Sequence, residues 1–306
     1  MKIDKAISLG AKSVGGITAA AITDMAIPGA SLIAGAVGEI VTSVTEDIAQ
    51  RMLSIAEKGR LDYVEQCIVD KVNERLAAGE QPRRDDEFYV KDEYEQSSAS
   101  KLLEEVLLKC KQEFEAKKLK SFGNFWTNIC FENSVTYEAA NSIITQFASL
   151  SYQQVKILTY LNVGAIIPLG KWEKYMFSNE TVAPYYTVYS DCLHLYNVRL
   201  AAQKDTDKGV RLGTPDICIS PSGKLMCRLL ELELTEQEFK EISTLIQNID
   251  GIVSRLMKEA KDDGSDRLLT TFTKDEIKKA FDEKVPEIID AARPKWDAED
   301  GTLTIK

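Results

Sequence analysis

The sequence predicts a mainly α-helical fold, a multi-helix bundle with a winged-helix-like segment that contains one small β-hairpin. Three observations predict it. Apolar residues recur at three- and four-residue steps through most of the chain, which is the period of an amphipathic helix. Capping boxes and a Ser-Pro start stand where several of these stripes begin. The best hairpin candidate is residues 198–219, where two short arms flank a polar loop that contains glycine.

The composition bounds the class of protein. With 306 residues the chain has room for two domains, or for one large domain with an appendage. An apolar fraction of 44% is enough for a core of ordinary size. The net charge of −10 argues against binding nucleic acid by charge alone, because phosphate binding needs a basic face. The six cysteines form no Cys-x-x-Cys pair, and Lys12 breaks the pattern of a signal peptide, so we expect a cytoplasmic protein with reduced thiols.

Residues 1–44 form the first predicted segment, which is rich in Ala, Gly and Ile. Between Ser13 and Gly38 the only charge is Asp24, and Pro28-Gly29 divides this stretch into two apolar pieces shorter than the roughly 20 residues of a membrane-spanning helix. Small residues four positions apart would form one stripe on a helix, where a second helix can approach closely. The stripe consists of Ala26, Ala30, Ala34 and Gly38. We expect a helical hairpin packed on the body; the alternative is a self-associating or membrane-active segment over residues 6–44.

Residues 45–149 form a predicted helical domain. Its first part, 45–78, has the pattern of one long amphipathic helix, with a break marked by Gly59 and an end at Gly79. A charged linker without any period follows at 80–98.

The second part of this domain returns to a strong helical pattern over 99–133. Its upstream apolar face includes Phe114. Its downstream face matches the i, i+3, i+4, i+7, i+8 template of a buried stripe. That stripe is Phe122, Phe125, Trp126, Ile129 and Cys130. A shorter helix is predicted over 137–149.

Residues 150–232 form the predicted winged-helix-like domain. Ser151-x-x-Gln154 is a capping box that opens a first helix. Two more helices and a hairpin follow, at 172–176 and 183–197, with the hairpin arms at Val198–Ala201 and Ile217–Ile219. Ser220-Pro221 then starts another helix, with serine as the cap and proline in the first helical position. Helix, helix, helix, hairpin, helix is the order of a winged helix-turn-helix variant.

Residues 233–306 are predicted to be C-terminal helices. Thr235-x-x-Glu238 is a second capping box, and an apolar stripe continues from it to Leu256. Asp262-Asp263-Gly264-Ser265 breaks the pattern, and Thr273-x-x-Glu276 is a third capping box.

The sequence contains no recognisable catalytic constellation. His194 is the only histidine, it lies within a predicted helix, and no Gly-x-Ser-x-Gly elbow is present. Neither a phosphate-binding loop nor a dinucleotide-binding glycine motif occurs. The acidic run from Asp205 lacks the later glutamate of a calcium loop. We therefore predict no catalytic residue, no metal site and no cofactor, with an enzyme of unrecognised site as one alternative.

The predicted wing is the strongest candidate for nucleic-acid contact. Residues 151–232 carry nine Lys and Arg against seven Asp and Glu, a net charge of +2, whereas the rest of the chain is at −12. The basic residues of the wing are Arg199, Lys204, Lys208 and Arg211. The helix at 183–197 has no Lys or Arg for base readout, and its tyrosines suit packing or protein contact. We expect a protein partner or self-association, with a DNA-binding regulator as the alternative.

Several short motifs of 99–232 resemble a family of bacterial helical proteins. They are Ser121-Phe122-Gly123-Asn124-Phe125-Trp126-Thr127-Asn128-Ile129, Leu150-Ser151-Tyr152 with Ile157-Leu158, Leu193 with Tyr196-Asn197, and Ile219-Ser220-Pro221-Ser222-Gly223. In these motifs the chain is similar to abortive-infection alpha-type proteins and their relatives. The usual Gly-Leu-Ile step before the hairpin reads Val198-Arg199-Leu200 here. The resemblance implies a role in phage resistance by host-cell shutdown and supplies no enzymatic site.

Together these observations predict a non-enzymatic interaction protein of a bacterium or its mobile elements, with a role in phage defence. The helical body would hold a winged-helix-like module for protein contact. The N-terminal segment would serve assembly or association with a membrane.

Overall fold

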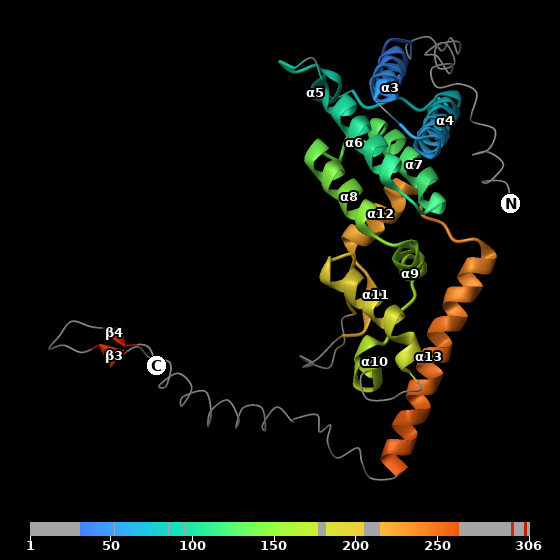
Figure 1. The fold of residues 1–306 in the computed structure, drawn as a ribbon, viewed down its shortest axis with the longest axis vertical. Helices are drawn as coiled ribbons and strands as arrows, with labels where there is room; N and C mark the ends of the chain where they lie inside the picture. The colour runs from blue at the N-terminus through green and yellow to red at the C-terminus, as the bar shows by residue number, and fades with distance from the viewer. Residues whose placement is uncertain are drawn as a thin grey trace. The chain divides into compact units, whose positions relative to one another are not determined.

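The structure, a computed structural model, describes residues 31–51, 53–84, 86–94, 96–176, 182–204, 215–262, 295–296 and 303–304. This part of the chain is mainly helical, with a small antiparallel hairpin among the helices, which confirms the predicted fold class (Figure 1). By contacts between residues the chain divides into two compact units, Met1–Ile252 and Val253–Lys306. The predicted boundaries after residues 44, 149 and 232 stay predictions.

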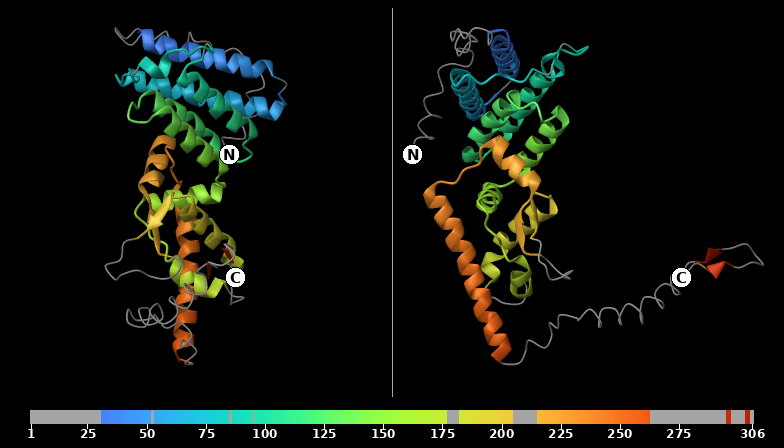
Figure 2. Two further views of the ribbon diagram at one scale, coloured as in Figure 1. Left: turned by 90° about the vertical axis from the view of Figure 1, so that its left-hand side faces the viewer. Right: turned by 180° about the vertical axis from the view of Figure 1, so that it is seen from behind.

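A helical bundle forms the first half of the Met1–Ile252 unit. Its helices are α3 (Ser31–Gln50), α4 (Ile55–Ala77), α5 (Asp86–Tyr89), α6 (Ser98–Gln112), α7 (Leu119–Cys130) and α8 (Tyr137–Ser149), with the 3-10 turn η2 (Ala116–Lys118) before α7. Helix α4 packs along α7, and α6 packs on α3, α4, α7 and α8 (Figure 1, Figure 2). The five residues predicted as the stripe on 122–130 are all fully buried, which confirms that this stripe belongs to the core.

The predicted single helix over 45–78 is wrong. Helix α3 ends at Gln50 and α4 begins at Ile55, because Ser54 and Glu57 form a capping box that starts a new helix. The Glu57 backbone N–H donates to the Ser54 hydroxyl at 3.3 Å, and the Ser54 N–H donates to the Glu57 carboxylate at 2.7 Å. Gly59 lies inside α4 and breaks nothing. The apolar period continued across this boundary, so periodicity alone hid it.

The prediction that Phe114 faces the core is also wrong. Helix α6 ends at Gln112, and the backbone of Glu113 is extended, with φ −77° and ψ 124°. Phe114 therefore lies beyond the helix, and 90% of it is exposed.

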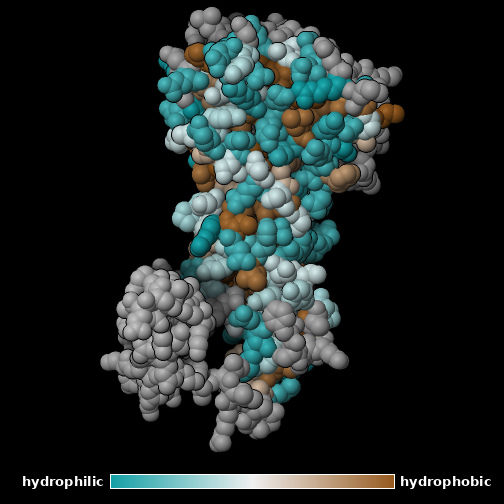
Figure 3. Space-filling model, turned by 60° about the vertical axis from the view of Figure 1, so that its left-hand side comes forward, coloured by the Kyte–Doolittle hydropathy of each residue, from teal (hydrophilic) through white to brown (hydrophobic). Residues whose placement is uncertain are grey.

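On the face of the molecule in Figure 3, hydrophilic side chains predominate and hydrophobic ones gather in small groups.

Gly123 stands among the aromatic residues of α7 because α4 approaches closely there. A Cβ atom at this position would meet the Cβ of Cys67 at 3.0 Å and the carbonyl oxygen of Val64 at 3.2 Å. The carbonyl oxygen belongs to the backbone of α4 and the Cβ atom is bonded directly to it, so neither atom can move without shifting the helix. The glycine thus sets the distance between the two helices.

The N-terminal stripe of small residues is described in part. Gly38 is buried in α3, and Val37, Val41 and Ile48 lie buried on the same helix, which packs on α6. Ala34 belongs to α3 as well, whereas Ala26 and Ala30 lie outside the described residues. At Gly38, therefore, the stripe of small residues is buried inside the fold of the chain itself. None of the helices described is both long and apolar enough to cross a membrane.

The second half of this unit has the predicted winged-helix-like order. It comprises α9 (Tyr152–Asn162), α10 (Leu169–Met176), η3 (Ala183–Tyr185), α11 (Tyr186–Asn197), β1 (Ala201–Gln203), β2 (Ile217–Ile219) and α12 (Pro221–Leu230). Strand β1 pairs antiparallel with β2, Ala201 lying opposite Ile219. Ile167, between α9 and α10, exchanges two backbone hydrogen bonds with Ile217, at 3.0 and 2.9 Å. This bridge adds a third strand position beside β2, which the sequence did not reveal.

The first arm of the hairpin lies later than predicted. Strand β1 begins at Ala201, whereas the predicted arm was Val198–Ala201. Val198 is the C-cap of α11, and Arg199 turns the chain with a positive φ of 66°. These two residues end the helix, so the strand cannot start before them.

Helix α13 (Glu236–Asp262) follows a short link and runs from one unit into the other. Its start confirms the capping box at Thr235 and Glu238, whose reciprocal hydrogen bonds measure 3.2 and 3.1 Å. The description of α13 stops at Asp262, so the predicted break after it and the third capping box lie outside the described residues. In the second unit, β3 (Lys295–Trp296) pairs antiparallel with β4 (Leu303–Thr304).

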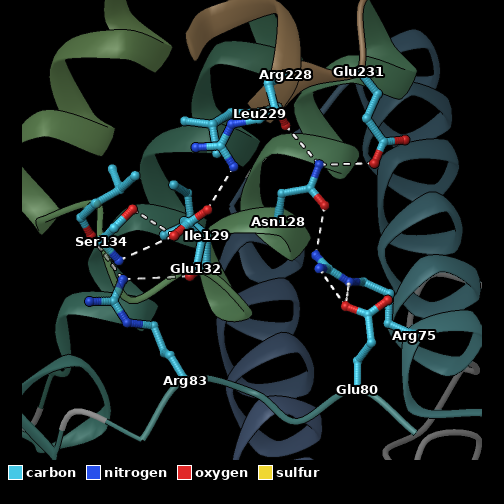
Figure 4. A network of polar contacts seen from close by, with 11 residues as sticks. Arg75, Glu80, Arg83, Asn128, Ile129, Glu132, Ser134, Arg228, Leu229 and Glu231 are labelled. Carbon is cyan, nitrogen blue, oxygen red and sulfur yellow. Dashed lines mark hydrogen bonds and ion pairs between the residues drawn. The ribbon is translucent and has the colours of Figure 1, made fainter. Parts of the chain in front are cut away.

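The winged-helix-like module is fixed to the bundle through α12 and α7 (Figure 4). The Asn128 amide of α7 donates to the carbonyl of Leu229 at 2.9 Å and to the carboxylate of Glu231 at 3.0 Å. Its oxygen accepts from Arg75 of α4 at 2.8 Å. Lys71, also on α4, pairs with Glu231 at 2.8 Å. One amide therefore ties the last turn of α12 to two helices of the bundle.

A second tie lies beside it. Arg228 of α12 pairs with Glu132, which follows α7, at 2.6 Å. Hydrogen bonds from Ser134 and from Arg228 lower the pKa of the Glu132 carboxyl to about 2. The ordinary pKa of a glutamate in an unfolded chain is about 4.3. Because the folded pKa is the lower one, the ionised form stabilises the fold above about pH 4.3, and this contribution is lost as the pH falls through about 2.

We predict that Glu132→Gln lowers the free energy of unfolding at neutral pH by about 1 kcal/mol, since one charge of the pair is exposed. The difference from the unmodified chain should shrink as the pH falls from about 4 to about 2. Urea titrations at several pH values measure it. A difference that stays constant over this range would contradict the assignment.

Gly223 gives a test of how closely α12 sits in its module. A Cβ atom there would lie 2.2 Å from the carbonyl oxygen of Leu200 and 2.8 Å from Ile219. We predict that Gly223→Ala lowers the free energy of unfolding by about 2–3 kcal/mol through overpacking.

The matched control is Gly251→Ala on α13, where an added Cβ meets nothing within 4 Å. That variant should gain up to about 1 kcal/mol, because alanine favours helix over glycine. Circular dichroism during urea unfolding compares the two. Equal stabilities of the two variants would mean that α12 does not approach Leu200 this closely.

Candidate functional site

Helix α11 holds the third-helix position of the module and presents a polar outer face. Its inner face is apolar and buried, with Val188, Tyr189, Cys192 and Leu195. Its outer residues are spaced by three, four and three positions, so they lie along one side of the helix. They are Thr187, Ser190, His194 and Asn197, and we call them the α11 stripe. All are exposed except His194, which is half-buried.

The two tyrosines near the start of α11 divide between core and surface. Tyr189 is 2% exposed and belongs to the core, as its position on the apolar face requires. Tyr186 is 44% exposed, and its ring lies 6.4 Å from that of Tyr189. Tyr186 therefore places one aromatic ring at the N-terminal end of the stripe.

Side chains from α8 and α9 hold α11 in place. Gln154 completes the capping box of α9 and also donates to Asp191 of α11 at 2.9 Å. Burial raises the pKa of the Asp191 carboxyl, and the hydrogen bond from Gln154 opposes that rise. Gln146 of α8 donates to the carbonyl of Val198 at 2.8 Å, just past the end of α11. Since the helix is tied at its middle and at its C-terminal end, the stripe has a fixed orientation on the module.

Two of the four predicted basic residues flank β1. Arg199 is exposed, and its strained backbone is held by the Ser220 hydroxyl, which donates to the Arg199 carbonyl at 2.7 Å. Lys204 is exposed just after the strand, and its N–H donates to the carbonyl of Asp216 at 2.9 Å. Neither charged group has an ion-pair partner among the described residues. Lys208 and Arg211 lie outside them.

The chemistry available on this face is hydrogen bonding. Hydroxyl and amide groups both donate and accept, so the stripe can match a polar surface without carrying a fixed charge. Within the described ranges no group of three His, Cys, Asp or Glu is placed to hold a metal ion. The six cysteines are unpaired, and burial raises the pKa of Cys130 and of Cys227 to about 12, so these two stay protonated thiols.

Sequence reasoning predicted the helix at 183–197, of which α11 forms residues 186–197, but did not single out the stripe. The signal was present, because Thr187, Ser190 and Asn197 are the polar complement of the apolar positions on the same helix.

Comparison with known proteins gives no relative from which a role for this surface could be inferred. No protein-family model matches the chain, and neither a curated protein nor a solved structure matches it.

Proposed function

We propose that the chain is a non-enzymatic interaction protein that contacts a protein partner through the α11 stripe. The observation that carries the proposal is an exposed row of neutral hydrogen-bonding side chains on a helix without Lys or Arg. The hydrogen bonds from Gln154 and Gln146 support it, because a helix already held in place loses little further freedom on binding.

The balance of charge favours a protein over DNA as the partner. Specific DNA binding commonly neutralises about 6–10 phosphates. Near the stripe, the described residues offer Arg199 and Lys204 as unpaired cations, and the whole chain has a net charge of −10. An exposed tyrosine beside serine and asparagine is, by contrast, a composition that the binding loops of antibodies use to contact proteins.

We place the partner among host or phage proteins and the protein itself in the cytoplasm. The resemblance of residues 99–232 to abortive-infection alpha-type proteins supports the first, and the unpaired cysteines support the second, since a reducing compartment keeps thiols free. Association of residues 6–44 with a membrane, or with a second copy of the chain, stays a prediction.

Site-specific photocrosslinking in bacterial cells tests the main proposal. A photoreactive amino acid at Ser190 or Asn197 should give discrete protein crosslinks, because both side chains are exposed on the stripe. The matched control is Asn248, an exposed residue of α13. The same crosslinks from Asn248, or none from the stripe, would contradict the proposal. Mass spectrometry then identifies the partner, and a phage protein or a host factor that phage require would support the defence role.

A double change on the stripe tests the energetics once a partner is in hand. Ser190→Glu with Asn197→Glu buries two unpaired charges in the interface, so binding should weaken at least about tenfold, or about 1.4 kcal/mol. Unchanged affinity would place the contact elsewhere. Circular dichroism should show an unaltered fold, because both side chains lie on the surface.

DNA binding is the second candidate, and the exposed, unpaired Arg199 and Lys204 support it. We expect no binding of duplex DNA tighter than the micromolar range at physiological salt. Fluorescence anisotropy across a salt series measures this.

The informative variant combines Arg199→Gly with Lys204→Ala. Glycine accepts the positive φ at position 199, so the charge is removed without adding strain. Tight binding by the unmodified chain, with a salt slope that falls by about 2 in the variant, would favour the regulator instead.

A further inference from the structure

A second site lies at the start of α7, on the side opposite its apolar stripe. A cavity of about 340 Å³ is lined by residues of η2 and α7, of α9, and of the link between α12 and α13. A neighbouring hollow of about 350 Å³ shares Lys117, Lys120, Tyr152, Glu233 and Thr235 with it, so the two adjoin. Pockets that hold small ligands begin at about 300 Å³. We call the first cavity the α7 pocket.

Two of the lysines that line the α7 pocket already have ion-pair partners in the chain. Lys118 is 2% exposed, and its ammonium pairs with Glu113 at 2.6 Å and donates to the carbonyl oxygens of Leu150 and Ala148 at 2.7 and 3.3 Å. Lys117 pairs with Glu238 at 2.5 Å. Neither ammonium needs a ligand.

The glutamates Glu231 and Glu238 also have ion-pair and hydrogen-bond partners in the chain. Glu231 belongs to the tie between α12 and the bundle. Glu238 accepts from the Tyr152 hydroxyl at 2.8 Å and from Thr235 at 2.9 and 3.1 Å, besides its pair with Lys117. Burial alone would raise the pKa of the Glu238 carboxyl, but these hydrogen bonds outweigh it and hold the pKa at about 2.

One positive and one negative side chain of the pocket lining have no such partner among the described residues. Lys120 and Glu233 line the α7 pocket, both are exposed, and neither has an ion pair or hydrogen bond within the described part of the chain. A ligand of one sign alone would leave the opposite charge facing it. The remaining charges therefore suit a ligand that carries both an anionic and a cationic group.

Two polar side chains of low exposure line the pocket. Asn124 is 3% exposed and Ser121 is 9% exposed, and both line the cavity. Neither side chain makes a hydrogen bond to any described residue. Their amide and hydroxyl groups can therefore form hydrogen bonds with a polar ligand that occupies the pocket. The apolar side chains of Phe147 and Val155 complete the lining.

We infer that the α7 pocket binds a small zwitterion of the amino-acid class, either a free amino acid or a dipeptide with an apolar side chain. The carboxylate faces Lys120, and the ammonium faces Glu233. The Asn124 amide and the Ser121 hydroxyl bond the polar groups of the ligand, and its side chain packs on Phe147 and Val155. This inference is independent of the α11 stripe.

Isothermal titration of the full chain with L-leucine, with leucyl-leucine and with N-acetyl-leucinamide tests the inference. The two zwitterions should bind, and the amide, which lacks both charges, should bind at least about tenfold more weakly, a difference of about 1.4 kcal/mol. Tighter binding of leucine identifies a free amino acid as the ligand, and tighter binding of leucyl-leucine identifies a peptide.

Three variants locate the binding site. Lys120→Gln, Glu233→Gln and Asn124→Leu should each weaken binding about tenfold or more, whereas Lys240→Gln, an exposed lysine of α13, should not. The absence of heat from either zwitterion at about 10 mM, where a ligand with a dissociation constant of about 1 mM is mostly bound, would overturn the inference. Equal affinity of the three pocket variants and the unmodified chain would overturn it as well.

Discussion

The architecture depends on α7, whose two sides are used for different purposes. The aromatic side fills the core of the bundle, and Gly123 lets α4 approach it closely. The other side is polar, with Ser121, Asn124 and Asn128 at three- and four-residue steps. Asn128 bonds the last turn of α12, so the helix that organises the bundle also holds the winged-helix-like module. A buried side-chain amide needs hydrogen-bond partners, and Asn128 finds them on α12 and α4.

This requirement connects the fold to both proposals. Asn128 is satisfied by the chain itself, and the result is a fixed junction. Asn124, one turn earlier, lines the α7 pocket and makes no hydrogen bond within the described residues, so its amide is available to a ligand. The side-chain amides of Gln154 and Gln146 likewise form hydrogen bonds within the chain and hold α11, so that its outer stripe is presented in one orientation. Hydrogen bonds of side-chain amides thus fix the junction between α7 and α12 and the orientation of α11.

Local patterns predicted the parts of this structure that local physics controls. The stripe from Phe122 to Cys130 and the capping boxes at Ser151 and Thr235 follow from helix periodicity and backbone satisfaction, and all were confirmed. The hairpin arm failed because the left-handed turn at Arg199 is not apparent from periodicity. The α7 pocket was out of reach, since residues near 121 and residues near 233 are brought together by packing alone.

Native-state hydrogen exchange tests the junction most directly. If α7 and α12 join the bundle and the module into one cooperative body, the slowest amides of α4, α7, α11 and α12 open with the same free energy. In Asn128→Ala, which leaves the Leu229 carbonyl and Glu231 without this partner, that free energy should fall in all four helices by a similar amount, about 1–3 kcal/mol. A variant in which the amides of α11 keep their protection while those of α7 lose theirs would contradict the account.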